Sequence, residues 1–285
     1  PKKMLVISYI LNLAAISLFS FMPQLSIVMT GVASALYHVA GGRLSAEKNR
    51  ATNIGIFAAP GVAGLIAGGY FAYSQIHIQY GLLAGAFLFL LWLSFAKFEL
   101  THQSEIKKQE QKFHLDGHDV VMMLLLIVIS FRSVVWNVFQ LVHDKEYGWL
   151  IAIAAAAFAG KLIGGWLADK IGWRLYSMLS LFIAMPLLTF FKKEMILLTI
   201  GIGLLQSSIP ATTSLLIGYM KNKTERAISL AFGTTIMAGA IVFYTPARNF
   251  LMNNIALLGI GIAMLGFLFL IKRISFPSKT AGKLS

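Results

Sequence analysis

Long apolar runs separated by short polar segments form the dominant pattern of this chain. A helix that spans a membrane needs about 20 mostly apolar residues, and ten runs come near that length. The predicted spans are Met4–Phe21, Gln24–Gly42, Thr52–Tyr73, Tyr80–Phe98, Asp119–Val142, Trp149–Ala168, Leu175–Phe191, Met195–Met220, Ala227–Thr245 and Ile255–Ile271. The pattern therefore predicts an all-α membrane protein with about ten transmembrane helices.

The polar segments between these runs alternate in charge. One set holds most of the 24 Lys and Arg residues and consists of Lys2–Lys3, Arg43–Arg50, Lys97–Lys112, Lys170–Arg174, Lys221–Arg226 and Lys272–Lys283. The segments between them, such as Ser74–Gln79, are shorter and carry less charge. Because excess Lys and Arg usually mark the cytoplasmic side, we expect a multi-pass protein of the plasma membrane with both termini in the cytoplasm.

Composition supports this class and excludes others. The 285 residues are 58% hydrophobic and only 12% charged, with a mean hydropathy of +0.75, whereas a soluble domain is about a quarter charged. The absence of cysteine excludes disulfides, thiolate nucleophiles and Cys-ligated metals. A membrane location accounts for the net charge of +13, so we do not expect nucleic acid as a partner. The sequence contains no HExxH motif, acidic pair or nucleophile–base pair, so we expect neither an enzyme nor a metal or cofactor.

The longest polar segment divides the predicted helices into four and six. We predict an N-terminal bundle over residues 1–98, a cytoplasmic central loop over 99–118 and a C-terminal bundle over 119–285. The loop is interpreted as a solvated linker, with a regulatory or partner-binding helix as the alternative.

Two short segments resemble each other and indicate an internal repeat. Arg50-Ala51 and Arg226-Ala227 each follow a basic loop and begin a helix rich in small residues. The same offset applied upstream pairs the first four spans with the last four and leaves spans five and six without partners. Two further helices before Pro1 would complete the repeat, so we expect either a fragment or a natural ten-span variant.

A tight charged turn between two apolar helices is the most specific motif. The segment Ala159–Arg174 reads AGKLIGGWLADKIGWR, and it resembles the signature loop of the major facilitator superfamily of secondary transporters, G-x-x-x-D-[RK]-x-G-R-[RK]. The matching residues are Gly165, Asp169, Lys170, Gly172 and Arg174. Trp173 stands where the family usually has an Arg.

The resemblance implies two six-helix halves, of which this chain covers the third to the twelfth helix. It also implies a gate on the cytoplasmic side. There, Asp169 is expected to accept hydrogen bonds from the first amides of the helix that begins near Arg50, where negative charge is favourable. The alternative is an ordinary basic loop with one capping Asp.

Two weaker motifs resemble particular branches of the family. In Gly55–Gly64, the residues Gly55, Pro60 and Gly64 fit the antiporter motif G-x-x-x-G-P-x-x-G-G, which implies exchange of solute against protons. The alternative is a packing helix that is kinked by its proline. The run ending in Tyr37-His38 resembles the fourth helix of fosmidomycin-resistance-like members. His38 is expected either to relay a proton near neutral pH or to lie at a helix interface.

Several polar residues inside predicted spans are candidates for binding solute. Arg132 lies at mid-span, where a charge costs at least ~2.5 kcal/mol. We expect it to face a central cavity and an anionic substrate group, with a structural ion pair as the alternative. Asn137 and Gln140 continue the polar character of that helix. Gln206 and Thr213 belong to a later polar run that either lines a cavity or bonds across helices.

These observations predict a secondary active transporter that moves a small solute by alternating access, in proton-coupled efflux. The alternatives are a non-transporting sensor or scaffold of the same fold and an uptake symporter for a small anion. The expected partners are a small-molecule substrate, the lipid bilayer and protons, and the expected state is a monomer. Because no predicted span carries Asp or Glu at mid-depth, the sequence assigns no carboxylate to proton coupling.

Overall fold

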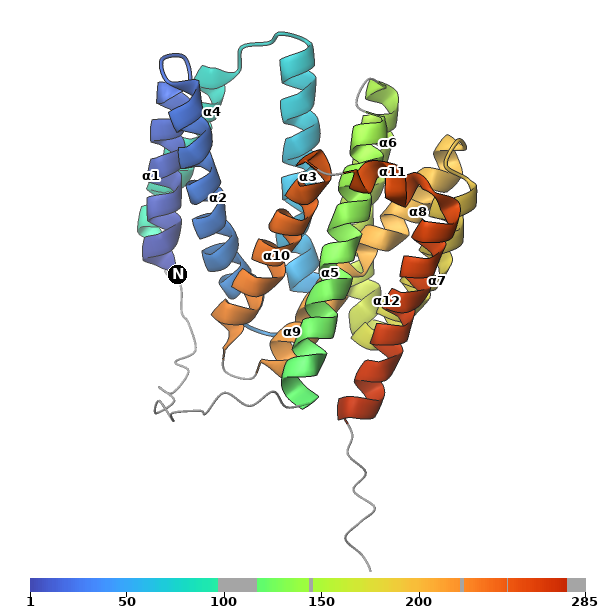
Figure 1. Cartoon of the computed structure of the whole chain (residues 1–285). Helices are drawn as coiled ribbons and strands as arrows, with labels where there is room; N and C mark the ends of the chain where they lie inside the picture. Colours follow the sequence, from blue (N-terminus) through green and yellow to red (C-terminus); the bar gives the residue numbers. More distant parts are fainter. Residues whose placement is uncertain (97–116, 144–145, 221–222, 245, 276–285) are drawn as a thin grey trace, which may run out of the picture.

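The molecule is a bundle of helices whose connections lie at its two ends (Figure 1). The computed structural model describes residues 1–96, 117–143, 146–220, 223–244 and 246–275. All regular secondary structure among these residues is helical, without strands. Eight helical segments are long and apolar enough to cross a membrane, so the chain is a multi-pass membrane protein.

Twelve helices make up the described part of the chain, and each predicted span has a counterpart among them. The helices are α1 (Lys2–Leu18), α2 (Pro23–Ser45), α3 (Ala51–Tyr73), α4 (Gln79–Phe95), α5 (Gly117–Val142), α6 (Tyr147–Ile171), α7 (Trp173–Phe190), α8 (Met195–Ser207), α9 (Ile209–Tyr219), α10 (Thr224–Tyr244), α11 (Ala247–Met252) and α12 (Asn254–Ser275). The predicted central loop lies almost wholly outside the described residues.

Two predicted boundaries need correction. The predicted span Met195–Met220 is interrupted at Ser208, which separates α8 from α9. Pro210 explains the break, because it lies in the first turn of α9 and has no backbone N–H with which to continue the helix. The segment from Pro246 to Asn254, expected to be a loop, contains the short helix α11.

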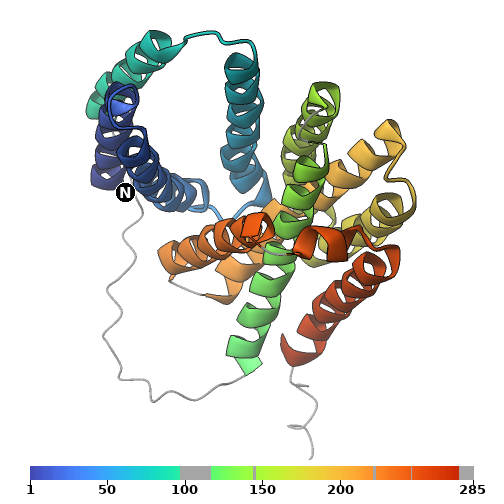
Figure 2. The same cartoon turned by 45° about the horizontal axis from the view of Figure 1, so that its top comes forward.

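Helices α1, α2 and α4 pack together on one side of the molecule (Figure 2). The buried hydroxyl of Ser8 donates to the carbonyl oxygen of Ala33 at 2.7 Å, and that of Ser26 donates to the carbonyl oxygen of Ala15 at 2.6 Å. Such bonds join α1 to α2 where apolar packing offers no advantage over lipid.

The main hydrophobic core lies in the second bundle, around α5. Leu125, Val128 and Phe139 of α5 are buried in it, together with Leu181 and Leu188 of α7. Helices α8, α9, α10 and α12 surround α5. The core therefore makes α5 the central element of this bundle.

Helix α3 connects the two bundles. The predicted boundary assigns it to the first bundle, but it lies mainly against α6, with further contacts to α9. Both views show α3 beside α6 and apart from α1 and α4 (Figures 1 and 2). The α3–α6 interface is thus the main contact across the predicted boundary.

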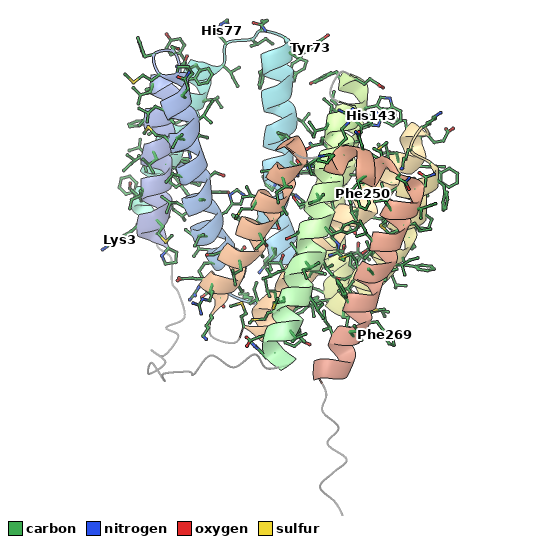
Figure 3. The ribbon with its side chains drawn as sticks, viewed as in Figure 1. Lys3, Tyr73, His77, His143, Phe250 and Phe269 are labelled. Carbon is green, nitrogen blue, oxygen red and sulfur yellow. The ribbon has the colours of Figure 1, made fainter. Side chains whose placement is uncertain are left out.

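The two ends of the bundle differ in charge. The basic loops that follow α2, α6 and α9 share one end, called the basic end, and the loops that follow α3 and α5 share the opposite end. Figure 3 shows Lys3 and Phe269 towards the basic end and Tyr73, His77 and His143 towards the opposite end. The alternation of loop charge predicted from the sequence is therefore present in space.

Candidate functional site

The turn between α6 and α7 holds Asp169 at the basic end of the α3–α6 interface. Gly172 permits this tight turn, because its φ of +95° is one that residues with a side chain rarely adopt. Helix α7 begins directly afterwards at Trp173. The turn therefore fixes both Asp169 and Trp173 next to the first residue of α3.

Four donors converge on the Asp169 carboxylate. The backbone N–H groups of Ala51 and Thr52 donate to Oδ1 and Oδ2, both at 2.9 Å, and the Thr52 hydroxyl donates to Oδ2 at 2.6 Å. The indole Nε1–H of Trp173 donates to Oδ1 at 2.7 Å. Ala51, Thr52, Asp169 and Trp173 are called the Asp169 cluster below. The carboxylate satisfies amides that have no partner inside α3. The predicted contact is thus present, and its role in gating stays a prediction.

Glycines let α3 and α6 approach each other closely. A methyl group at Gly165 would lie 2.6 Å from the carbonyl oxygen of Ala51, and one at Gly55 would collide with the carbonyl oxygen of Lys161. Neither carbonyl can move without shifting its helix. This close packing through small residues is typical of helix interfaces in membranes.

The other charged residues of the signature motif have different partners. Lys170 Nζ lies 3.6 Å from the centre of the Trp166 ring. Arg174 Nε donates to the carbonyl oxygen of Leu268 in α12 at 2.9 Å. The donor beside Asp169 is instead the neutral indole of Trp173, at the position where the family pattern has Arg.

A second contact joins the bundles at the basic end, between α2 and α10. Arg43 Nη1 lies 3.7 Å from Glu225 Oε1. Further from this end, the His38 ring lies 5.4 Å from the Phe232 ring, centre to centre, and His38 Nδ1 lies 2.8 Å from the Ser34 carbonyl oxygen. His38 is thus at a helix interface, which agrees with one of its two interpretations, and a role in proton relay stays a prediction.

Aromatic rings join α3 and α6 at the opposite end. The Tyr73 and Tyr147 rings are nearly parallel, at 8°, with centres 5.5 Å apart, and the Tyr70 ring lies 5.9 Å from Tyr147. Within the described residues, no hydrogen bond or ion pair joins the two helices here. His143 of the neighbouring loop stacks on Trp149, and burial lowers the pKa of its imidazole, against the weaker opposing effect of the nearby Glu146 carboxylate.

Arg132 does not face a cavity, which corrects the prediction from the sequence. Its side chain is fully enclosed in the second bundle. The guanidinium donates to the Thr212 hydroxyl at 3.0 Å and to the carbonyl oxygens of Ser208 and Ser177 at 3.3 and 3.4 Å. These partners are neutral, so the alternative of an ion pair is not met either. Ser208 follows the last residue of α8, where the negative end of the helix dipole favours a cation.

No hydrogen bond joins any two of the remaining polar candidates within the described residues. Asn137 Nδ2 donates to the Ser133 carbonyl oxygen in its own helix at 3.0 Å. Gln140 is half-buried one turn further on. Gln206 and Thr213 are buried in the second bundle, and the Thr213 hydroxyl is without a partner among the described residues. Their roles in solute binding stay predictions.

The residues of the predicted helix-kink motif lie on different faces of α3. The helix continues through Pro60, which is exposed. Gly55 packs against α6 and α9, whereas a methyl group at Gly64 would meet no atom within 4 Å. Of the two glycines, Gly55 alone provides close packing in the part of the chain that the structure describes. The implied role in antiport stays a prediction.

Lys161, in the middle of α6, is a candidate that the sequence analysis does not single out. It lies four residues before Gly165, the first residue of the signature pattern. Its side chain is half-buried, and no hydrogen bond or ion pair involves its amino group within the described residues. The signal in the sequence is a lone ionisable residue at mid-membrane depth, which by itself indicates a functional site.

Comparison with known proteins identifies the fold. Neither a protein-family model nor a curated protein matches the sequence. The crystal structure of the E. coli fucose:proton symporter FucP is similar at a TM-score of 0.69 and 15% identity, over 97% of this chain and 84% of that chain. A structure of FucP described as a major facilitator superfamily transporter in the outward conformation gives 0.68 and 15%, over 97% and 83%. The chain therefore has the fold of the major facilitator superfamily.

Proposed function

We propose that this protein is a secondary active transporter that moves a small solute across a membrane by alternating access. The observation that carries the proposal is the Asp169 cluster, which joins the start of α3 to the end of α6. These hydrogen bonds can break without unfolding either helix, and the glycines beside them let two rigid surfaces move past each other. The fold supports the proposal, because alternating access in such bundles is largely rocking of one half against the other.

The proposed orientation places the basic end in the cytoplasm of the cell, with the protein in the plasma membrane and both termini cytoplasmic. The Asp169 cluster and the pair of Arg43 and Glu225 then close the cytoplasmic side in this conformation. The similarity to FucP in an outward conformation is in keeping with this assignment.

Proton-coupled efflux is the proposed direction, supported by the partial match of Gly55, Pro60 and Gly64 to an antiporter motif. His38 is the proposed proton relay. Proton-coupled uptake is the second candidate, and it is favoured by the similarity of the fold to a fucose:proton symporter.

The proposal includes two further helices of the family beside α3. The α3 face that carries Gly61, Gly64 and Gly68 has open space where side chains would lie, and glycine-rich faces suit close helix packing in membranes. Transport by a chain extended with the upstream reading frame, compared with the present chain, tests this part.

Reconstitution in proteoliposomes with a pH-sensitive dye inside tests the function. L-fucose is the first solute to try because of the structural similarity, followed by small organic anions and drug-like compounds. We expect a gradient of one of them to move protons in wild-type vesicles and much less in Asp169→Asn vesicles. A scaffold would move no protons with any solute. The accessibility to water of its basic end and of its opposite end would also stay constant.

A further inference from the structure

Lys161 lies deep in α6, on the face that packs against α3. It precedes Asp169 by two helical turns, so its Cα lies roughly 12 Å further from the basic end at a rise of about 1.5 Å per residue. Its backbone carbonyl contacts Gly55 of α3, and Ala157 and Gly165, one turn before and after it, are buried on the same face. The side chain therefore begins at the α3–α6 interface rather than on the outer surface of α6.

Helices of both bundles meet at this depth. Gly55, which contacts Lys161, also lies beside the ring of Pro210 in the first turn of α9. A methyl group placed on Gly55 would lie 3.4 Å from Pro210 Cγ. The junction is thus formed by α3 from the first bundle and by α6 and α9 from the second. A transporter that rocks its two bundles would open and close space at this junction.

The ammonium group of Lys161 has no partner within the described residues, and the helices offer no carboxylate at its depth. Each Asp or Glu in the described helices lies in a first or last turn, as Asp119, Asp169 and Glu225 do. An unpaired charge at mid-membrane is unfavourable, and such residues usually face the interior and mark a substrate or ion pathway. The half-buried side chain also keeps part of its surface accessible.

Arg132 shows how a purely structural cation is held in the same molecule. It is fully enclosed, and its guanidinium donates to three protein oxygens. Lys161 is half-buried, and its amino group has no partner within the described residues. An anion from outside the chain would give the Lys161 ammonium a partner, whereas the two terminal nitrogens of Arg132 already donate to protein oxygens and only its Nε has no partner among the described residues.

We propose that Lys161 binds the anionic group of the transported solute, which makes that solute a small organic anion such as a carboxylate. This inference rests on the proposed transport function and adds the substrate class to it. An ammonium group has three donors for carboxylate oxygens, and hydrogen bonds between charged partners are about twice as strong as neutral ones. Loading the anion would also neutralise the lone charge inside the membrane.

Binding of matched solutes to the full chain in nanodiscs tests the inference. Two pairs of solutes are compared by calorimetric titration: D-gluconate with D-glucose, and D-glycerate with glycerol. The first member of each pair carries a carboxylate, and the second is neutral. We expect a carboxylate to bind and its neutral counterpart not to bind. Lys161→Gln should weaken that binding at least about tenfold, and Lys161→Arg should retain most of it. Lys193→Gln, in the exposed loop after α7, is the control for the lost charge and should change nothing.

Three results of this titration would overturn the inference. They are binding of the neutral solutes alone, carboxylate binding that survives Lys161→Gln, and no binding by either carboxylate. Each leaves the transport proposal standing, because that proposal depends on the Asp169 cluster and is tested by the accessibility of the two ends.

A second measurement does not depend on the solute. The chain has no cysteine, so Lys161→Cys introduces a single thiol without further changes. We expect the membrane-impermeant, anionic reagent 2-sulfonatoethyl methanethiosulfonate to label it in proteoliposomes. A folded protein that stays unlabelled from both sides would show that this position never meets water, and the site would be ruled out.

Discussion

The two ends of the α3–α6 interface are held by different chemistry. At the basic end, the Asp169 carboxylate accepts backbone and hydroxyl hydrogen bonds from the start of α3. At the opposite end, Tyr147 stacks on Tyr73 and lies beside Tyr70. The first contact depends on a charge and on exact donor positions, whereas the second is apolar and tolerates sliding.

Because of this difference, the two ends should respond differently when the bundles move. Charge-assisted hydrogen bonds are strong at good geometry and weaken steeply as it is lost, so the basic end suits two discrete states, closed or open. Aromatic contacts contribute about 0.5–1.5 kcal/mol over a range of ring positions, so the opposite end can adjust gradually. We therefore expect substitutions at the basic end to have the larger effects.

The largest effect is expected from Asp169→Asn, which removes the charge and keeps the size. Hydrogen bonds to charged groups contribute about 1.5–3 kcal/mol, so the ratio of closed to open basic ends should fall at least about tenfold. Solute flux should fall with it. A single thiol from Ala46→Cys, at a buried position after α2, should become more reactive. Asp119→Asn removes the same charge at the same end and should leave both measurements unchanged.

The next largest effect is expected from Gly165→Ala. The added methyl would lie 2.6 Å from the Ala51 carbonyl oxygen, so the helices must separate. Overpacking of this kind costs about 1–3 kcal/mol, and the Tm should fall by several degrees in a thermal unfolding assay. Gly148→Ala, in the first turn of the same helix α6, where the methyl meets open space, is the matched control. Equal Tm values for the two variants would contradict the close approach.

A smaller effect is expected from Trp173→Phe, which removes the Nε1–H donor to Asp169 and keeps an aromatic ring. This single hydrogen bond to the carboxylate is exposed to solvent, so we expect its loss to cost about 1 kcal/mol, below the range for enclosed bonds to charged groups, and the closed state should lose roughly fivefold in population. Trp173→Arg, which restores the residue of the family pattern, should close the basic end more tightly. The reactivity of the thiol introduced by Ala46→Cys measures both changes. If this reactivity shifted in the same direction in the two variants, the donor at position 173 would not control closure of the basic end.

At the opposite end, Tyr147→Ala should loosen the contact with Tyr73 by about 0.5–1.5 kcal/mol. Tyr147→Phe keeps the ring and should behave as the wild type. Spin labels at Ser74 and Glu146, both exposed, measure the separation. A longer distance with Phe as well would show that the hydroxyl, and not the stacking, holds this end.

The smallest effect concerns His143. Burial holds the pKa of its imidazole below the ordinary value, so the unfolded chain takes up this proton more readily than the folded one. The free energy of unfolding therefore suffers no loss from His143 above the ordinary pKa, about 6.5, and it decreases as the pH drops below that value. We expect the Tm to fall by roughly 1–2 °C between pH 7.5 and 5.5 because of this imidazole. His143→Phe keeps the stacking on Trp149 and should abolish this fall in Tm. An identical pH dependence in the variant would contradict it.

The α6–α7 turn could be predicted from the sequence because its determinants are local. A glycine is needed for the φ of Gly172, and an acidic side chain three residues earlier sits at a helix end. The span pattern could also be predicted, because lipid demands long apolar helices. The span pattern predicted the fold class, whereas the partner of Asp169 was implied by the resemblance of the turn to the family's signature loop.

The direction of single side chains inside the membrane could not be predicted. Arg132 lies on a helix that is apolar on nearly every side, because lipid and protein interior are similar surroundings, so the sequence does not reveal which face is enclosed. The break at Ser208 was hidden in a polar run, since a proline inside a membrane helix either bends or interrupts it. Lys161 was hidden in a similar way, because it lies among small residues four positions before the signature pattern begins.

The most direct test of the central claim is the distance between spin labels across both ends in one preparation. The pair at Lys48 and Lys223, exposed in the loops before α3 and α10, reports the basic end, and the pair at Ser74 and Glu146 reports the opposite end. Since the chain has no cysteine, each pair needs only two substitutions. We predict that Asp169→Asn lengthens the first distance and shortens the second. Unchanged distributions at both ends would contradict a gate at Asp169.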